Sequence, residues 1–301
     1  MRPLCPRYHW FEIHDQTWFP DYFREKVQAC LTLAWTMRVR PLQKCSPADL
    51  VAKTLLSVLP PGQAAEYTFV DFCAGAGGPT PTIEKVLNAQ LKSDATTDPA
   101  PSAHFVLTDL HPHLEAWAAV AKKSDKLGYV STPVDASDAP RDLLKDRQGG
   151  NKVFRLFFLA FHHFDDPLAA TILRNSIETA DGFAIFELQE RTLLSMVMVT
   201  SLGLLLMLIS PFYFWRSPGH LFFTYIIPIV PFVVTFDGYI SSIRTRSADE
   251  ILALLEPKND PDPAATSHLT KQWKFGDGRV MHSDPIGYMS YFIGVKKDAQ
   301  D

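Results

Sequence analysis

The segment FVDFCAGAGGPTPTIE, at residues 69–84, constrains the fold most, because it passes from an apolar run through small residues into a helical pattern. Tyr67–Phe72 is short, apolar and rich in strand-forming residues, and Pro81–Leu91 can be helical. In a strand–turn–helix unit, glycines allow backbone N–H groups to approach a ligand closely. The turn is therefore predicted to bind a phosphate, a dinucleotide or another nucleotide-like cofactor.

Apolar runs and helical patterns alternate after this segment, which indicates a parallel, doubly wound sheet and thus an α/β fold. The further predicted strands are Phe105–Thr108, Tyr129–Pro133, Phe154–Phe161 and Gly182–Leu188, with Lys271–Phe275 and Met289–Val295 completing the sheet. The predicted helices are Asp21–Arg38, a helix from Pro47 to near Pro60 with Ser46 as its N-cap, and His113–Lys126. A further helix is predicted to begin at Pro167 after the N-cap Asp166, and the capping box Ser247-Ala248-Asp249-Glu250 opens a short one. Polar loops are expected at 92–103, 141–152 and 257–270.

Two long uncharged runs interrupt this pattern after the fifth strand, at residues 193–214 and 221–236. The first is long enough to cross a bilayer, for which about 20 residues suffice, whereas Pro228 and Pro231 weaken a straight helix in the second. We favour a membrane-embedded helical hairpin that either spans the bilayer or lies in one leaflet. The alternative is a hydrophobic helical pair that covers the globular domain as a lid.

The charges that flank the hairpin predict its orientation. Arg191, Arg244 and Arg246 lie on the flanks, and Arg216 lies in the turn, so the globular part is expected to face the cytosol at an intracellular membrane. The expected parts of the chain are an N-terminal helical lid (1–62), a cofactor-binding core (63–192), the hairpin (193–236) and a C-terminal part that completes the sheet (237–301).

Composition narrows the function classes. The 301 residues carry a net charge of −4, which argues against a general nucleic-acid binder. The four cysteines form no C-x-x-C pair, which favours a reduced, intracellular setting, and the N-terminus lacks the continuous apolar core of a secretory signal.

The residues of the glycine turn distinguish between cofactors. A dinucleotide fingerprint requires G-x-G-x-x-G, but Pro79, Thr80 and Pro81 follow Gly75-Ala76-Gly77-Gly78. A phosphate-binding P-loop requires a lysine that this turn lacks. Asp71 precedes the glycines instead, and a carboxylate suits a cationic cofactor but would repel a pyrophosphate.

The run Asp71-Phe72-Cys73-Ala74-Gly75-Ala76-Gly77 resembles the first motif of class I S-adenosylmethionine methyltransferases, with Cys73 in place of the first glycine. The resemblance implies a Rossmann-like sheet and S-adenosylmethionine as cofactor. It also implies an acid after the second strand for the ribose, a neighbouring apolar residue for the adenine, and an acid after the third strand. The cofactor-binding residues expected on this basis are Asp71, Cys73, Ala74, Gly75, Gly77, Asp109, Leu110, Asp135, Ala136 and Phe161.

A wider resemblance covers nearly the whole chain. Residues 71–79, the Phe161–Phe164 segment and Phe236-Asp237-Gly238 with Ser241, Arg244 and Thr245 are similar to motifs of a group of fungal and bacterial methyltransferase-like proteins. This similarity implies fold and cofactor but no reaction. The turn is also similar to that of DNA cytosine methyltransferases, but the chain lacks the Pro-Cys nucleophile those enzymes need after the fourth strand.

Methyl transfer requires a nucleophile in line with the methyl group, and a base only if the nucleophile must lose a proton. His162 and His163, at the carboxyl end of the fourth strand, are the candidate bases, although one of them could be structural. Asp166 fits a helix cap better than a metal ligand, so we expect no metal site. The candidate substrate pocket contains Trp18, Phe19, Tyr22 and Glu187, with His14 and Asp15 as weaker candidates; core packing is the alternative for the aromatic residues.

The leading hypothesis is therefore a membrane-held methyltransferase that acts on a lipophilic small molecule. The alternative is a non-catalytic membrane protein that retains the fold and acts as a scaffold or partner.

Overall fold

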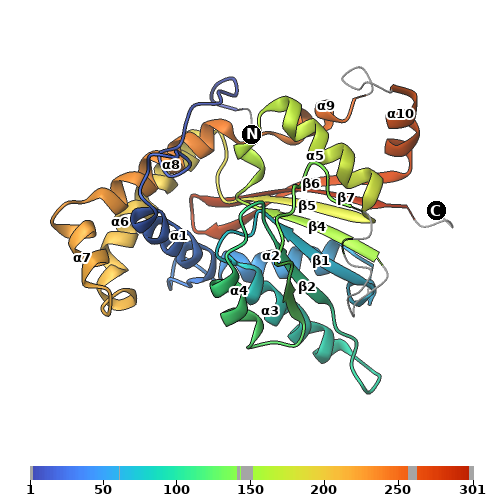
Figure 1. Cartoon of the computed structure of the whole chain (residues 1–301), viewed down its shortest axis with the longest axis horizontal. Coiled ribbons are helices and arrows are strands. Elements are labelled where there is room, and N and C mark those ends of the chain that lie inside the picture. Colours follow the sequence, from blue (N-terminus) through green and yellow to red (C-terminus); the bar gives the residue numbers. More distant parts are fainter. Residues whose placement is uncertain (1–2, 61, 141–142, 144–151, 257–262, 298–301) are drawn as a thin grey trace.

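A single seven-stranded sheet organises the chain (Figure 1). The computed structural model describes residues 3–60, 62–140, 143, 152–256 and 263–297. The strand order is β3-β2-β1-β4-β5-β7-β6, in which β1 to β5 are parallel and β7 runs antiparallel to both of its neighbours. The predicted α/β fold class with a Rossmann-like, largely parallel sheet is confirmed. The strands are β1 Tyr67–Phe72, β2 His104–Thr108, β3 Leu127–Tyr129, β4 Lys152–Phe158, β5 Gly182–Glu187, β6 Trp273–Ser283 and β7 Gly287–Lys296.

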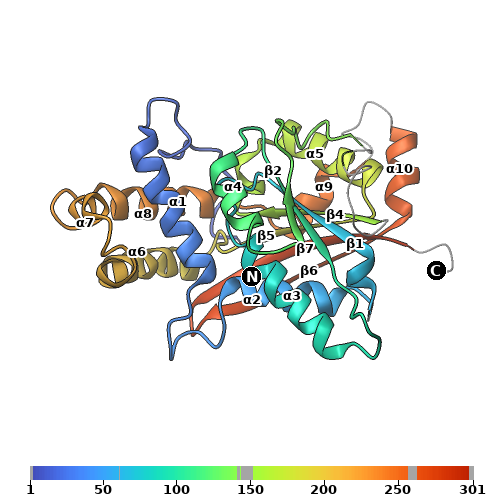
Figure 2. The same ribbon diagram turned by 60° about the horizontal axis from the view of Figure 1, so that its bottom comes forward.

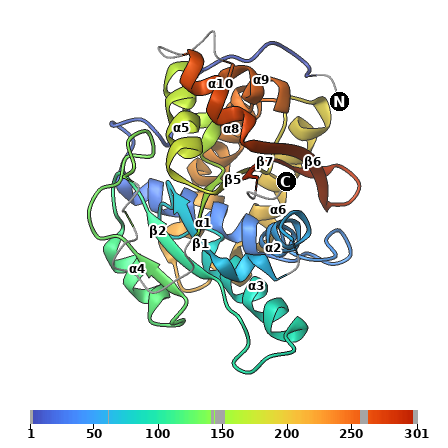
Figure 3. The same ribbon diagram turned by 90° about the vertical axis from the view of Figure 1, so that its right-hand side faces the viewer.

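Helices cover both faces of the sheet, which explains why β1 and β5 are buried along their whole length (Figures 2 and 3). One face packs against α2 and α3, with Trp117 of α4 in the same core, and the other packs against α5 and α9. Phe69 and Phe105 stack between the neighbouring strands β1 and β2 with ring centroids 4.9 Å apart. The covering helices are α2 Pro47–Val58, α3 Thr80–Asp94, α4 Leu114–Ala121, α5 Asp166–Thr179, α9 Ala248–Leu254 and α10 Pro263–Lys271.

Four further helices form a bundle at one end of the sheet, on the left in Figure 1. Helix α6 (Leu193–Tyr213) follows β5, and α7 (Pro218–Tyr225) and α8 (Ile229–Arg244) return to the domain with a bend of 68° between them. The N-terminal helix α1 (Asp21–Thr36) packs its apolar face on α6 and α8. By length and composition α6 could cross a membrane, and α7 with α8 would count as a second span only if the bent pair were one segment.

Local signals fix several boundaries where we predicted them. Ser46 and Asp49 form a capping box at α2, and Ser247 and Glu250 form another at α9. At α5 the cap is Asp165, which accepts a hydrogen bond from the Leu168 amide at 2.9 Å, and not Asp166 as we predicted. Asp166 instead pairs with Arg246, which can reach it because α5 and α9 share one face of the sheet.

Other predicted boundaries are wrong. Strand β3 pairs with β2 over Leu127–Tyr129, so it begins two residues before the predicted strand Tyr129–Pro133 and ends where that strand was expected to start. Strand β4 ends at Phe158, because Leu159 has a φ of 48° and Phe161–His163 forms a short 3-10 helix. Residues 263–271, predicted as mostly loop, form α10 with a proline at its start, where its missing N–H costs nothing. The rest of that loop, and residues 141–142 and 144–151 of another, lie outside the described residues.

Candidate active site

The glycine turn after β1 has a backbone that few residue types tolerate. Cys73, Gly75, Gly77 and Gly78 have φ values of 62°, 51°, 107° and 45°, in the left-handed region. The amide of Ala74 donates to the Thr108 carbonyl at 3.1 Å, which ties the turn to the end of β2. Because β1 and β2 are in register up to their last residues, Cys73 and Asp109 leave the sheet side by side.

Asp71, the acid ahead of the glycines, lies buried beneath this turn and is 1% exposed. Its Oδ2 accepts a hydrogen bond from the Thr80 hydroxyl. Its Oδ1 has no hydrogen-bond partner among the described residues. Burial raises the pKa of Asp71 well above its usual value, and the nearby charge of Asp109 adds to the shift. A cationic group at this position would stabilise the ionised carboxylate.

Asp109, the residue directly after β2, organises the backbone of the glycine turn. Its Oδ2 accepts from the Gly75 amide at 2.9 Å and its Oδ1 accepts from the His111 amide at 2.8 Å. The indole N–H of Trp117 donates to the Gly75 carbonyl at 2.8 Å. The carboxylate is partly exposed, so it can accept further hydrogen bonds from a ligand.

These residues line a cavity of about 240 Å³, called here the cofactor cavity. The turn supplies one wall, the end of β4 (Phe158, Leu159, Ala160) supplies another, and α1 covers the cavity. The predicted residues Asp71, Cys73, Ala74, Gly75 and Asp109 line it. The residues from α1 (Gln28, Leu31, Thr32 and Trp35) were missed: their helical spacing indicates one face, but no local signal says what that face covers.

The other five predicted cofactor residues do not line this cavity. Leu110 is 50% exposed, and Asp135 is exposed with Oδ1 bound to the Ser137 amide at 2.8 Å. Ala136 and Phe161 are buried in the core on the α5 face, and Gly77 supports the turn through its amide, which donates to the Ala74 carbonyl at 2.8 Å.

A second, smaller cavity of about 110 Å³ lies beside the cofactor cavity, and we call it the apolar pocket. Its walls are aliphatic side chains of α1, α6 and α8, among them Val27, Met198 and Val234. Four residues, His14, Leu31, Leu159 and His163, line both cavities. The two spaces are therefore neighbours that share these side chains as a common wall.

Charged groups gather at one end of the apolar pocket. Glu12 is 1% exposed, and its Oε1 lies 3.0 Å from Arg244 Nη1 and accepts a hydrogen bond from the Ser241 hydroxyl at 3.0 Å. Nδ1 of His163 lies 2.9 Å from Asp15 Oδ2. Although burial opposes the charged form of the ring, Glu12 and Asp15 raise the pKa of His163 to about 9. His163 is therefore protonated at neutral pH when it faces only these two carboxylates.

His162 has a different environment. Its Nδ1 lies 2.8 Å from Glu187 Oε2, and its backbone amide donates to Glu187 Oε1 at 3.1 Å. Gln189 Nε2 donates to the same Oε2 at 3.0 Å. The other ring nitrogen, Nε2, lies 3.5 Å from Glu12 Oε1. Glu187 thus fixes the orientation of a ring that lines the apolar pocket.

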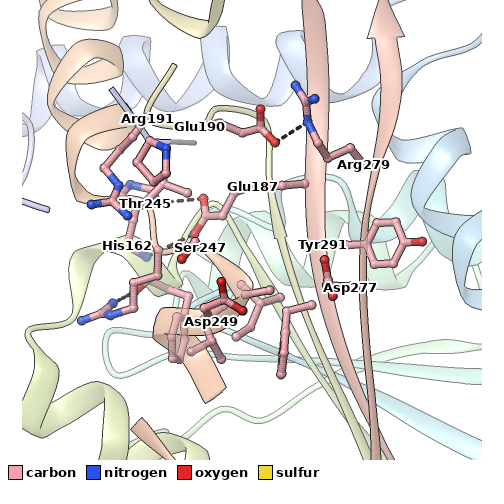
Figure 4. Close-up of a pocket in the computed structure, with 18 of the residues that line it drawn as sticks. His162, Glu187, Glu190, Arg191, Thr245, Ser247, Asp249, Asp277, Arg279 and Tyr291 are labelled. Atoms are coloured by element: carbon pink, nitrogen blue, oxygen red, sulfur yellow. Dashed lines mark hydrogen bonds and ion pairs between the residues drawn. The ribbon is translucent and has the colours of Figure 1, made fainter. Parts of the chain in front are cut away.

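A third cavity, of about 300 Å³, lies on the other side of His162 and Glu187, and we call it the polar cavity (Figure 4). It is bordered by β5, β6, β7 and the start of α9, and Arg279 Nε lies 2.6 Å from Glu190 Oε1 at its edge. His162 lines both this cavity and the apolar pocket. The His162–Glu187 pair therefore stands between an apolar and a polar space.

The aromatic residues that we predicted for the substrate pocket lie on other faces of the N-terminal segment. Trp18 is 65% exposed, Tyr22 is exposed, and Phe19 is buried in the bundle core with α6 and α8. Packing explains Phe19, since it fills the contact between α1 and the bundle. Of the weaker candidates, His14 lines both cavities and Asp15 contacts His163.

The chain matches no known family model and no curated protein sequence. Among solved structures it is similar to magnesium protoporphyrin IX methyltransferase from Synechocystis PCC 6803 with bound SAH, at 11% identity over 95% of this chain and 91% of that one, with a TM-score of 0.44. A SAM-dependent methyltransferase from Anabaena variabilis ATCC 29413 matches at 12% identity over 99% of both chains, with a TM-score of 0.46. The N-methyltransferase NodS from Bradyrhizobium japonicum WM9 matches at 10% identity over 84% of this chain and 98% of that one, with a TM-score of 0.39.

Proposed function

We propose that this chain is an S-adenosylmethionine-dependent methyltransferase that acts on a lipophilic small molecule at a membrane. The observation that carries the proposal is the shared wall between the cofactor cavity and the apolar pocket. A transferase must hold its donor and its acceptor in contact, and most of its rate gain comes from that positioning.

The residues of the cofactor cavity suit a cationic methyl donor. S-adenosylmethionine supplies an electrophilic methyl group when bound, and its ammonium group would satisfy the orphaned Oδ1 of Asp71. Asp109 would accept hydrogen bonds from the ribose hydroxyls, while Leu110 and the Asp135–Ala136 segment would lie near the adenine. Gly75 would let the backbone approach the ligand closely, because it has no side chain and tolerates a φ of 51°, while Gly77 supports the turn.

His162 is the better of the two candidate bases. Its Nε2 faces Glu12 at the charged end of the apolar pocket, and Glu187 both fixes the ring and would stabilise its positive charge after proton transfer. His163 is less suited to this role, because its Nδ1 already lies 2.9 Å from Asp15 Oδ2 and 3.7 Å from Glu12 Oε2.

Membrane association rests on the apolar surface of the bundle. Leu204, Leu208 and Phe212 of α6 are 65%, 71% and 78% exposed, and their i, i+4, i+8 spacing places them on one helix face. Exposed apolar patches of this kind mark interaction surfaces. Because α1 of the same bundle carries Asp21 and Glu25 on its exposed side, we favour insertion of the α6 face into one leaflet, with the domain in the cytosol.

The first test is isothermal titration of the protein with S-adenosylmethionine and its demethylated product. Binding at physiological concentration is expected, and its absence would overturn the proposal. The second test is untargeted lipid and metabolite profiling of a deletion strain, in which one compound should lack the mass of a methyl group. Wild type should restore that compound, whereas His162→Asn should not, although it should bind the cofactor within about threefold of wild type.

The same strain separates catalysis from a scaffold role. If Asp71→Ala and Asp109→Ala both abolish cofactor binding and yet correct the defect of the deletion strain, the protein acts as a non-catalytic partner.

A further inference from the structure

Four residues at the charged end of the apolar pocket bring together the side chains of a metal site. Glu12, His14, Asp15 and His163 each offer one ligand atom, and these four atoms all lie within 4.8 Å of one another. Three of the residues come from the segment before α1 and one from the 3-10 helix after β4. The sequence gives little hint of this cluster, because about 150 residues separate its two parts.

A buried carboxylate oxygen points into the cluster. The side chain of Glu12 is 0% exposed, and its Oε2 has no hydrogen-bond partner in the part of the chain that the structure describes. This oxygen lies 3.7 Å from Nδ1 of His14 and 3.7 Å from Nδ1 of His163. An orphaned buried oxygen is costly, and an ion at this position would remove the cost.

The spacing and the surroundings suit a small divalent cation. Ligands of a tetrahedral zinc ion, each about 2.0–2.1 Å from the metal, lie about 3.3–3.4 Å apart. The observed separations are 2.9 Å between His163 Nδ1 and Asp15 Oδ2 and 3.4 Å between His14 Nε2 and Asp15 Oδ1. Nδ1 of His14 lies 2.9 Å from Asp237 Oδ2, the outer carboxylate contact that commonly orients a metal-bound histidine.

The net charge of the cluster also suits a divalent cation. With neutral histidines, Glu12, Asp15 and Asp237 carry three negative charges and Arg244 one positive charge, so a divalent cation would balance the group. Arg244 Nη1 lies 3.0 Å from Glu12 Oε1 and 3.4 Å from Asp15 Oδ2, whereas Glu12 Oε2 faces the ring nitrogens of the two histidines. Two imidazoles and two carboxylates form a mixed nitrogen–oxygen donor set, which suits zinc, iron or manganese better than calcium.

We propose that Glu12, His14, Asp15 and His163 bind one divalent transition-metal ion at the charged end of the apolar pocket. Glu12, His14 and His163 line that pocket, so the ion is within reach of an oxygen of a molecule bound there. Such an ion would polarise that oxygen as a Lewis acid. The site is separate from the cofactor-binding acids Asp71 and Asp109, and its occupancy does not depend on the methyl transfer proposed above.

The test uses the full-length protein after chelation and dialysis, in the absence of S-adenosylmethionine. Zn²⁺ is measured by equilibrium dialysis with elemental analysis, and the visible spectrum is recorded with Co²⁺. Wild type should bind one equivalent of Zn²⁺, and Asp15→Asn and His163→Gln should each weaken binding at least about tenfold. His113→Asn changes an exposed histidine directly before α4, outside the four-residue cluster; it is the matched control and should bind as wild type does.

Two results would overturn the proposal. The first is that wild type retains less than one equivalent of Zn²⁺ and leaves the spectrum of aqueous Co²⁺ unchanged. The other is Zn²⁺ binding that neither substitution weakens, which would place the metal elsewhere. The Co²⁺ spectrum of wild type tests for nitrogen ligands directly, so it remains informative even if a variant fails to fold. Titration with S-adenosylmethionine on the same metal-free protein tests the methyltransferase proposal separately.

Discussion

Two residues with strained backbones border the cofactor cavity. Cys73 and Leu159, with φ values of 62° and 48°, are the non-glycine residues with positive φ among those the structure describes, and they follow β1 and β4. Strained backbones tend to gather at functional sites. Burial raises the pKa of the Cys73 thiol, so this side chain packs rather than reacts.

Cys73→Gly tests that interpretation. Glycine adopts this φ without strain, so the variant should raise the free energy of unfolding by up to about 1 kcal/mol. Cofactor affinity should stay within about tenfold of wild type, because the backbone rather than the thiol shapes the turn. Urea unfolding and isothermal titration measure the two quantities, and a total loss of binding would show that the thiol itself contacts the ligand.

Asp71 is expected to make the affinity for the proposed cofactor depend on pH. Burial raises its pKa, so the carboxylate holds a proton at low pH and cannot balance an ammonium group. Affinity should therefore rise with pH up to the pKa of the cofactor's own amino group, about 7.7. Asp71→Asn should bind at least about tenfold more weakly and lose this dependence, whereas the exposed Asp125→Asn should behave as wild type. Titrations between pH 5 and 7 distinguish the two variants.

At the scale of elements, local signals predict the first strands and the capped helices well. β1 has the predicted bounds, and both capping boxes start helices, because these features depend on neighbours in sequence. β3 is predicted poorly, because three residues in register with β2 define it rather than an apolar run. The coverage of the cavity by α1, and the approach of Glu12 to His163, depend on tertiary packing that no local pattern encodes.

Helices α6 and α8 approach each other closely at two glycines. A Cβ on Gly203 would lie 2.2 Å from Thr235 Oγ1, and one on Gly238 would lie 2.7 Å from Val199 Cγ1. Gly203→Ala should gain up to about 1 kcal/mol of helix propensity, but the overlap costs about 1–3 kcal/mol. We expect net destabilisation of about 1 kcal/mol in chemical unfolding. Adding Thr235→Ala should restore stability, and a destabilisation that persists in this double variant would rule out the overlap as its cause.

His282 of β6 is expected to make the folded protein less stable in mild acid. Burial lowers its pKa to about 4, so between pH 4 and 6.5 the unfolded chain binds a proton that the folded protein excludes. Stability therefore rises with pH across this window, and from pH 7 to pH 5 this group alone should cost about 2 kcal/mol. His282→Gln should remove that part of the loss. Unfolding free energies at the two pH values for both proteins give the comparison, and equal losses would contradict the assignment.

At the scale of the whole molecule, three cavities lie in sequence around two histidines. The cofactor cavity adjoins the apolar pocket through His163, and the apolar pocket adjoins the polar cavity through His162. The parallel sheet explains the first contact, since the ends of β1, β2 and β4 meet at one edge. The inserted bundle explains the second, because α6 and α8 supply apolar walls that the sheet lacks.

The bundle also gives the molecule an apolar side, on which Leu204, Leu208 and Phe212 of α6 are exposed. If this side enters one leaflet, the apolar pocket between α1, α6 and α8 lies next to the lipid, and an acceptor dissolved in the membrane has a short path to it. Binding to phosphatidylcholine vesicles in co-sedimentation is therefore expected for wild type.

Leu208→Glu with Phe212→Glu should reduce this vesicle binding at least tenfold, because each buried apolar side chain contributes about 1.5–3 kcal/mol. Leu168→Glu is the control: this residue is 41% exposed on α5, which packs on the sheet away from the bundle. Circular dichroism should show all variants folded, since the substituted side chains lie outside the core. Wild type that stays in the supernatant, or a double variant that sediments with vesicles as wild type does, would mean that the α6 face meets another protein rather than a membrane.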